Sequence, residues 1–348
     1  MSRLARSVVA LGCALGAALA GAAVPAAASD DSFFSLQWNL AQIRAADAWA
    51  GSTGAGVTIG IVDTGVDADH PDLRGKIDAT ANCVGGTCRE GNAYDVHGHG
   101  TMVAGIIVAN GVVKGGATGV TLSVYKAIAG AGEREGTGRD QDVAAAIRQA
   151  VADGAQVICL SLGSGRGLLL GPDTAQAAEE AVQRGIYVVA AAGNEGQESG
   201  TRDVTAPADV AGVIAVAAVD ADRRVAAFSN PGAKNGPLGP TSVTLVPRSD
   251  PSKKPEVAAP GVRILSTHLD GKYYYADGTS LAAPFVSAGI ALLLEAKPGW
   301  APGKGHSVSD FKFALLKGAE KLPGQQTPHD PKAGYGLFRA DRTLGHLN

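Results

Sequence analysis

The sequence predicts an α/β fold in which a mostly parallel sheet is covered by helices on both faces. Three observations predict it. Short apolar runs rich in β-branched residues recur along the chain and are bounded by Gly or Asp, as buried strands are. Helical patterns separate these runs, and strands that alternate with helices form parallel sheets buried between helical layers. Gly is abundant, 48 of 348 residues, but has no collagen-like period, so it serves tight turns and close backbone approaches.

The expected elements follow in order along the chain. Five runs are expected as buried strands: residues 57–62, 122–128, 156–162, 186–191 and 213–219. Three segments are expected as helices: residues 140–154, 173–185 and 280–295. In the first of these helices Val143, Ile147 and Val151 form an apolar stripe. Residues 231–255 contain six Pro, so they are expected as a Pro-rich surface loop inserted into the domain.

The N-terminal segment is expected to be cleaved off. Arg3 and Arg6 precede an uncharged run, residues 7–28, which ends in small residues and is typical of a secretory signal peptide. A membrane anchor is the alternative, because 22 uncharged residues can span a bilayer, but the Ala- and Gly-rich composition favours the signal peptide. We therefore expect a secreted protein with a signal peptide over 1–28 and one domain over 29–348.

Charge and cysteine usage narrow the classes of partner. Loss of the signal peptide removes two positive charges and changes the formal net charge from −3 to −5. An acidic chain without a basic stripe is not expected to bind nucleic acid or an anionic membrane, and no stable membrane anchor is expected.

Cys83 and Cys88 are expected to form a disulfide, because a metal site lacks a second Cys or His pair nearby. Cys159 lies in an apolar run and is expected as a buried free thiol.

Three polar residues stand where the expected elements end or begin. Asp63 follows the first strand, and a carboxylate held there can orient a base. His99 lies between two Gly and opens a helix of small residues; a metal pair with His97 is the alternative, but no acidic or His cluster completes it. Ser280 starts an apolar helix, where its hydroxyl is either an N-cap or a nucleophile beside N–H donors for an oxyanion.

The order Asp63, His99, Ser280 and the motifs around these residues resemble those of the subtilases, the subtilisin-like serine proteases. The matching segments are Asp63-Thr64-Gly65, Gly98-His99-Gly100-Thr101, Ala191-Ala192-Gly193-Asn194 and Gly278-Thr279-Ser280 with Pro284, a residue expected in the first helical turn. The resemblance implies a subtilisin-like three-layer fold and a serine endopeptidase. In that mechanism Asp63 orients His99, and His99 removes the proton of Ser280, which attacks the peptide carbonyl to form an acyl-enzyme. Asn194 is implied as an oxyanion donor.

The resemblance also implies where polypeptide substrates bind. Two segments are expected to line the cleft: Ser161, Leu162 and Gly163, and Ala191, Ala192 and Gly193. The first would pair with an extended peptide as an added strand, and the small side chains leave room for a large substrate side chain. A dedicated processing protease of narrow specificity is the alternative function. An inactive peptide-binding homologue would lack a triad or oxyanion residue, and none is missing. Ser280 does not fit the esterase motif, and residues 123–126 fit the β-lactamase S-x-x-K motif without its partner motifs.

Two features depart from the family pattern. Only residues 29–37 separate the predicted cleavage site from the matching region, so no inhibitory prosegment fits between them. A protein inhibitor or folding helper acting in trans is therefore a candidate partner of an enzyme expected as a monomer. Asp72 and Gln37 correspond to ligands of a structural calcium ion, but Lys114 stands where that site wants oxygen ligands. The chemistry itself requires no cofactor, and a structural calcium stays open at this point.

Overall fold

The computed structural model describes residues 33–129, 138–163, 170–198, 203–232 and 248–348. The strands are β1 (Thr58–Asp63), β2 (Ile77–Asn82), β3 (Arg89–Glu90), β4 (Thr121–Lys126), β5 (Val157–Leu160), β6 (Tyr187–Ala191), β7 (Ile214–Val219), β8 (Val257–Pro260), β9 (Ile264–His268) and β10 (Lys272–Ala276). The α-helices are α1 (Trp38–Gln42), α2 (Ala45–Trp49), α3 (His99–Val108), α4 (Asp140–Ala152), α5 (Pro172–Gln183), α6 (Thr279–Ala296), α7 (Val308–Gly318) and α8 (Ala340–Leu344). The predicted signal peptide, residues 1–28, lies outside the described residues.

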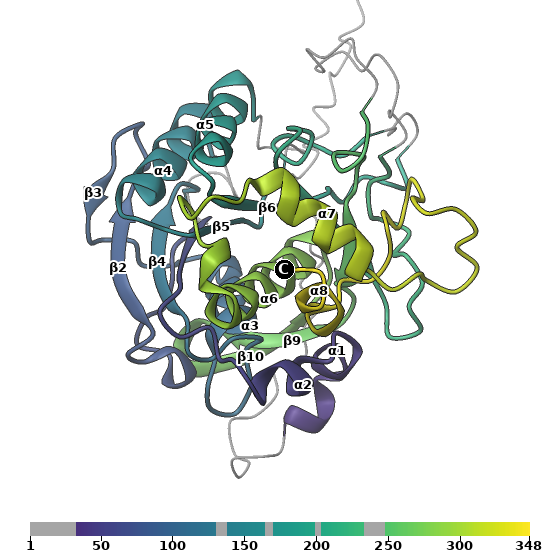
Figure 1. The fold of residues 1–348 in the computed structure, drawn as a ribbon. Coiled ribbons are helices and arrows are strands. Elements are labelled where there is room, and N and C mark those ends of the chain that lie inside the picture. The colour runs from purple at the N-terminus through teal and green to yellow at the C-terminus, as the bar shows by residue number, and fades with distance from the viewer. Residues whose placement is uncertain (1–32, 130–137, 164–169, 199–202, 233–247) are drawn as a thin grey trace, which may run out of the picture.

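One large sheet organises the molecule (Figure 1). Its eight strands follow the order β3-β2-β4-β1-β5-β6-β7-β8, and all neighbours are parallel except β2 and β3. Strands β9 and β10 form a separate antiparallel hairpin. The predicted α/β fold with a mostly parallel sheet is confirmed.

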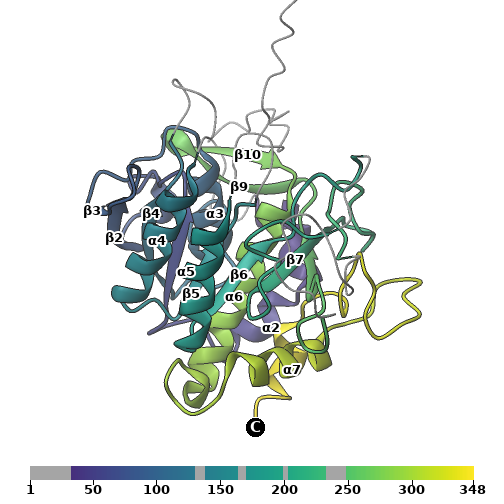
Figure 2. The same ribbon diagram turned by 90° about the horizontal axis from the view of Figure 1, so that it is seen from above.

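Helices cover both faces of this sheet, as two views at right angles show (Figures 1 and 2). Helices α4 and α5 lie on one face, while α3 and α6 lie on the other. Strand β1 shows how its sequence serves both layers, because successive side chains point to opposite faces. Ile59 and Ile61 pack in the core around α3 and α6, and Val62 packs in the core around α4 and α5.

The five predicted strands and three predicted helices are all present, with boundaries shifted by up to two residues. Strand β2 was not predicted because its residues are mostly half-exposed and form no apolar run. Helix α6 corrects one detail: it begins at Thr279, so Pro284 is its sixth residue and not part of the first turn. A proline there cannot donate to the carbonyl of Ser280, four residues earlier.

Helix α6 is the central helix of the fold. Every residue from Thr279 to Leu294 is buried, and although the helix is long and apolar enough to cross a membrane, 89% of it is buried inside the protein. Its last turn is attached to the loop before β1 through Glu295. The Oε2 atom of Glu295 accepts hydrogen bonds at 2.6–3.0 Å from the Ser52 hydroxyl and from the backbone N–H groups of residues 53–55.

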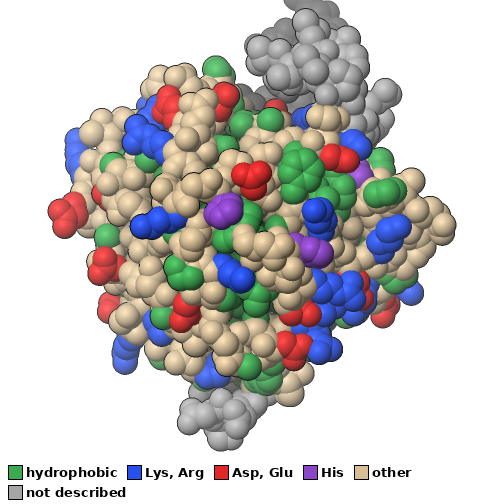
Figure 3. Space-filling model, in the orientation of Figure 1, with side chains coloured by type: hydrophobic (Ala, Val, Ile, Leu, Met, Phe, Trp, Pro, Cys, Tyr) green, Lys and Arg blue, Asp and Glu red, His purple; other side chains and the backbone are tan. Residues whose placement is uncertain are grey.

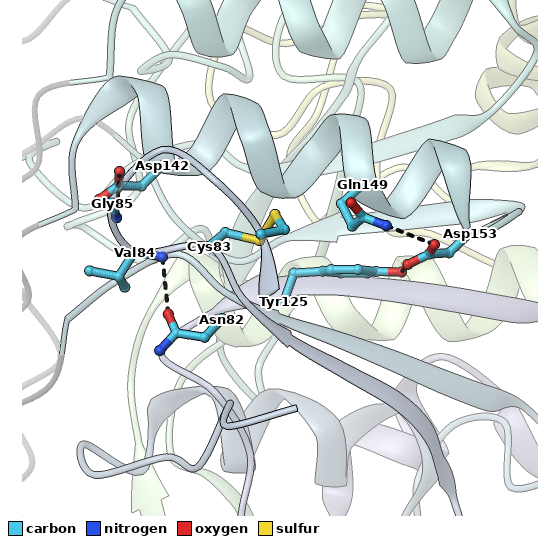
Figure 4. The surroundings of a disulfide bond; sticks show 9 residues. Asn82, Cys83, Val84, Gly85, Tyr125, Asp142, Gln149 and Asp153 are labelled. Carbon is cyan, nitrogen blue, oxygen red and sulfur yellow. Dashed lines mark hydrogen bonds between the residues drawn. A yellow bond between two sulfur atoms is a disulfide. The ribbon is translucent and has the colours of Figure 1, made fainter. Parts of the chain in front are cut away.

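A disulfide fastens the outer edge of the sheet (Figure 4). Cys83 and Cys88 are bonded, as predicted, in the turn between β2 and β3. The backbone N–H of Gly85 in this turn donates to the Asp142 carboxylate of α4 at 3.2 Å. Closing so short a loop stabilises the fold by roughly 2 kcal/mol on a chain-entropy argument. The predicted free thiol, Cys159, is buried in β5.

The Pro-rich segment 231–255 is described only at its two ends, and its C-terminal end is buried where a surface loop was expected. Lys254 is 0% exposed, and its ammonium lies 3.0 Å from Glu256 Oε1. Lys312 of α7 approaches the same oxygen at 2.6 Å, while Glu256 Oε2 accepts the backbone N–H of Ala215 at 2.8 Å. Burial lowers the pKa of Lys254 to about 7, against the attraction of Glu256. An enclosed ionic cluster thus attaches this segment to β7 and α7.

The surface view shows a face with mixed charge (Figure 3). Lysine and arginine side chains lie among aspartate and glutamate side chains on this face. Pairs such as Arg148 with Glu180, 2.8 Å apart and both substantially exposed, are of the surface kind that contributes up to about 1 kcal/mol.

Candidate active site

The predicted site residues follow strands near the point where the strand order of the sheet reverses. Strand β1 lies between β4 and β5; strands β2 and β3 lie beyond β4, and strands β6 to β8 lie beyond β5. Parallel sheets bind ligands at the carboxyl ends of the strands beside such a point. Asp63 ends β1, residues 161–163 follow β5, and residues 192–194 follow β6.

Asp63 and His99 form a buried pair. The Asp63 side chain is 0% exposed, and its Oδ1 accepts the backbone N–H of Thr64 at 2.7 Å and lies 2.8 Å from Nδ1 of His99. A carboxylate can only accept, so Nδ1 carries the proton and the neutral ring keeps Nε2 as an acceptor. Burial opposes a charge on His99, but the Asp63 carboxylate outweighs it and raises the pKa of His99 above its ordinary value. This is the arrangement of an oriented general base.

Glycines allow the turns that carry this pair to touch. Gly98 is the N-cap of α3 with φ +95°, a conformation that suits glycine. A Cβ atom on Gly100 would lie 2.1 Å from the carbonyl oxygen of Gly65, in the turn after Asp63. The G-H-G sequence thus brings the start of α3 directly onto the end of β1.

Asp95 holds together the two turns that carry Asp63 and His99, a role that was not predicted from the sequence. It is fully buried and accepts five hydrogen bonds at 2.7–3.0 Å, from the Thr64 hydroxyl, from the N–H groups of residues 97 and 98, and from the N–H and hydroxyl of Thr101. Burial alone would raise its pKa, but these donors, first that of Gly98, lower it. Asp95 therefore joins the turn after Asp63 to the first turn of α3.

Ser280 and Asn194 face a common space. Gly278, not Ser280, is the N-cap of α6, so the reading of Ser280 as a helix cap is wrong. Asn194 Oδ1 accepts the N–H and the hydroxyl of Thr279, each at 2.9 Å, which directs its NH₂ group the other way. A Cβ atom on Gly278 would lie 2.8 Å from Ser280 Oγ and 3.6 Å from Asn194 Nδ2. The glycine thus keeps open a space lined by a hydroxyl and an amide donor.

Asn230 fixes the loop that carries Asn194, and no signal in the sequence identified it. Its Oδ1 accepts the N–H of Glu195 at 2.7 Å, its Nδ2 donates to the Glu195 carboxylate at 3.0 Å, and its own N–H donates to the Gly193 carbonyl at 3.0 Å. Gly193 has φ +112°, and a Cβ atom there would lie 2.4 Å from Asn230 Nδ2. Both the backbone N–H and the carboxylate of Glu195 are therefore hydrogen-bonded to Asn230.

The two expected cleft segments lie side by side. Strands β5 and β6 pair in parallel, and a Cβ atom on Gly163 would lie 3.9 Å from the carbonyl oxygen of Ala191. Ser161 and Leu162 are buried, and Leu162 packs in the core around α4 and α5, so its backbone is what a peptide would meet. Ala191 and Ala192 are buried as well, and Ala192 packs in the same core. Pairing with a substrate at these positions stays a prediction.

Asp72 does not fit a calcium site in this fold. Its carboxylate accepts the backbone N–H of Val113 at 2.9 Å and the Tyr273 hydroxyl at 3.0 Å. A Cβ atom on Gly111 would lie 2.2 Å from Oδ1, so the backbone of that loop closes against the carboxylate. Hydrogen-bond donors thus stand where a cation would need to be. Among the described residues, no three His, Cys, Asp or Glu side chains form a metal site, and the pair His97 and His99 is not completed.

The side-chain amide of Gln37, the other predicted calcium ligand, is also hydrogen-bonded to protein groups. Its amide pairs with the backbone of Lys114 twice: Oε1 accepts the N–H at 2.9 Å, and Nε2 donates to the carbonyl at 2.8 Å. The Lys114 ammonium donates to Asn110 Oδ1 at 2.9 Å. The amide and side-chain oxygens that calcium would take are therefore bound to protein donors.

Comparison with known proteins decides the family. The sequence model described as the subtilase family matches residues 54–336. The chain belongs to the subtilase family. It is 37% identical over 254 residues to Subtilisin DY of Bacillus licheniformis, covering 71% of this chain and 80% of that protein. It is 35% identical over 305 residues to Thermitase of Thermoactinomyces vulgaris, covering 86% and 94%. It is also 35% identical over 259 residues to the Major intracellular serine protease of Bacillus subtilis (strain 168), covering 72% of each. This subtilase is a serine-type endopeptidase that acts on polypeptides.

Proposed function

We propose that this subtilase hydrolyses peptide bonds through an acyl-enzyme formed on Ser280. The observation that carries the proposal is the buried Asp63–His99 pair, joined at 2.8 Å, which leaves Nε2 of His99 as the acceptor. His99 takes the proton of Ser280 Oγ as the oxygen attacks the substrate carbonyl, and Asp63 stabilises the imidazolium that results. His99 then protonates the leaving amine. A water molecule, activated by the same base, hydrolyses the ester and restores Ser280.

The oxyanion of each tetrahedral intermediate would be bound by Asn194 Nδ2 and the backbone N–H of Ser280. Support comes from Thr279, whose two donors hold Asn194 Oδ1 and so aim the NH₂ group toward Ser280. Such donors act strongly because they are already oriented before charge develops. Backbone pairing with residues 161–163 would align the substrate across this site.

We further propose that the enzyme is exported and acts as a monomer. The signal-like residues 1–28 and the Cys83–Cys88 disulfide both favour an oxidising compartment outside the cytoplasm. A partner in trans, either an inhibitor or a folding helper, would act on the enzyme after export. Refolding of pure protein from denaturant tests this, because recovery of activity without additions would exclude an obligatory helper.

Replacement of the nucleophile tests the mechanism. Ser280→Ala should abolish peptide cleavage while leaving circular dichroism unchanged. Ser287→Ala is the matched control, because Ser287 lies on the same helix, is buried, and donates to the Ala283 carbonyl within that helix at 3.1 Å. A fluorophosphonate probe should add to Ser280 in the parent enzyme and in Ser287→Ala. Cleavage at the parental rate by Ser280→Ala would refute the assignment.

Side-chain specificity is measured by mass spectrometry of products from a peptide library. Cutting at many sequences indicates general degradation. Cutting confined to one sequence motif indicates a processing protease.

A further inference from the structure

The β9–β10 hairpin joins the histidine helix to the nucleophile helix. The Ser266 hydroxyl donates to the Met102 carbonyl of α3 at 2.8 Å, and the Thr267 hydroxyl donates to the Thr101 carbonyl at 2.7 Å. A Cβ atom on Gly105 of α3 would lie 2.2 Å from Thr267 Oγ1, so strand and helix are in close contact. Strand β10 then ends at Ala276, four residues before Ser280.

His268, the last residue of β9, lies against the turn that carries His99. A Cβ atom on Gly98 would lie 2.2 Å from Nε2 of His268 and 2.6 Å from its Cε1. The ring of Tyr274, from β10, packs against His268 with centroids 4.3 Å apart. The imidazole is therefore held between the hairpin and the residue that immediately precedes His99.

The turn is held from a second direction by Asp95, which accepts the Gly98 N–H at 2.9 Å. The charged and titratable groups that face His268 are Asp95, His97, Lys272 and Asp270. Burial is the largest influence and lowers the pKa of His268. The pKa of His268 is thus shifted in the direction opposite to that of His99, which the Asp63 carboxylate raises.

We propose that His268 is a positioning residue for catalysis: its ring, between Gly98 and Tyr274, fixes the turn before His99 and so sets the imidazole relative to Ser280. This inference rests on the proposed function of Asp63, His99 and Ser280. A ring of similar shape should serve the same purpose without titrating. Loss of the ring leaves a gap beside Gly98 into which the turn can relax.

Variants at this position test the proposal through kcat and KM. His268→Ala should lower kcat for a fluorogenic peptide by about 10- to 100-fold, the scale of small misplacements of a catalytic group, with KM within about twofold. His268→Phe should retain kcat within about twofold, because it restores the packing. An unchanged kcat in His268→Ala, a loss confined to KM, or equal losses in both variants would overturn the proposal. If His268→Ala does not fold, His268→Val replaces it, because Val suits a strand and also lacks the ring.

A second measurement separates this inference from the proposed function. In the Ser280→Ala background, the NMR titration of His99 needs no activity. His268→Ala should move the His99 midpoint toward its ordinary value, since a displaced imidazole loses part of its interaction with Asp63, whereas His268→Phe should leave it in place. If the parent enzyme cleaves no peptide, the proposed function fails while this titration still judges the positioning. An unmoved midpoint in His268→Ala would reject the positioning role even in an active protease.

Discussion

Removing Glu256 should destabilise the protein more than any exposed ion-pair change, because it leaves the buried amino groups of Lys254 and Lys312 without their carboxylate. Lys254 and Lys312 lie 3.0 and 2.6 Å from Glu256 Oε1, and all three side chains are at most 1% exposed. Breaking a buried pair by removing one partner costs about 3–5 kcal/mol. We therefore expect Glu256→Gln to lower the free energy of unfolding by about that amount. Glu180→Gln, which removes the exposed pair with Arg148, should cost at most about 1 kcal/mol.

The complementary change is Lys254→Met. It leaves one ammonium, that of Lys312, against one carboxylate, so the cluster stays paired and the loss of stability should be much smaller than in Glu256→Gln. Lys254→Met should also weaken the dependence of the free energy of unfolding on pH. The pKa of Lys254 is about 7 in the folded protein, while an unfolded lysine titrates near 10.4. Between these values the unfolded chain binds the extra proton, so the stability of the parent rises with pH, by at most about 1.4 kcal/mol per unit.

Urea unfolding in the Ser280→Ala background, which prevents self-digestion, measures both effects by fluorescence at pH 7.5 and 9. The contribution of Lys254 is the difference between parent and Lys254→Met in the slope of unfolding free energy against pH, because other groups titrate alike in both. A free energy of unfolding of Glu256→Gln within about 1 kcal/mol of that of its parent would refute the argument. An unchanged slope in Lys254→Met would refute it as well.

Three further predictions concern the active site and its surroundings. The kcat/KM value should rise with pH through the raised pKa of His99, because the base must be neutral. In the Ser280→Ala background, Asp63→Asn should lower the midpoint of the His99 titration measured by NMR. An unmoved midpoint would contradict the pairing of His99 with Asp63. Asn194→Ala should lower kcat by about 100- to 1,000-fold, a range established on a subtilisin, and an effect on KM alone would count against an oxyanion role. A chelator should leave the thermal midpoint unchanged, whereas Gln37→Ala should cost about 1–3 kcal/mol by removing two hydrogen bonds; a chelator-sensitive midpoint would reinstate calcium.

The sequence predicted the elements whose character is local. Strand β1 and helix α4 were identified because their apolar runs and stripes reflect burial on two faces or on one. Strands β2 and β10 were not identified, because their mostly half-exposed residues form no apolar run. Strand β9 is buried but was not identified either, because Ser266, Thr267 and His268 interrupt its apolar pattern. The end of the Pro-rich segment was expected at the surface, but Lys254 there is buried beside Glu256, and Lys312 of α7 donates to Ser252. No local pattern encodes these contacts.

The site shows the same division. Asp63, His99, Ser280 and Asn194 stand in motifs that are read from neighbouring letters. The residues that hold them in place are distant in sequence: Asn230 acts on a loop 35 residues away, and His268 acts on a turn about 170 residues away. A solitary polar residue at such a distance has no sequence spacing that distinguishes it from any other asparagine or histidine.

The position of the nucleophile on α6 has a consequence for how the enzyme loses activity on heating. The helix is buried from Thr279 to Leu294 and fastened at its last turn through Glu295, so its amide hydrogens should exchange with solvent only when the whole molecule opens. The reactive serine is thus carried by the segment that unravels last. Heat should therefore not produce a folded but inactive population; the loss of catalytic turnover and the loss of the fold should follow a single time course.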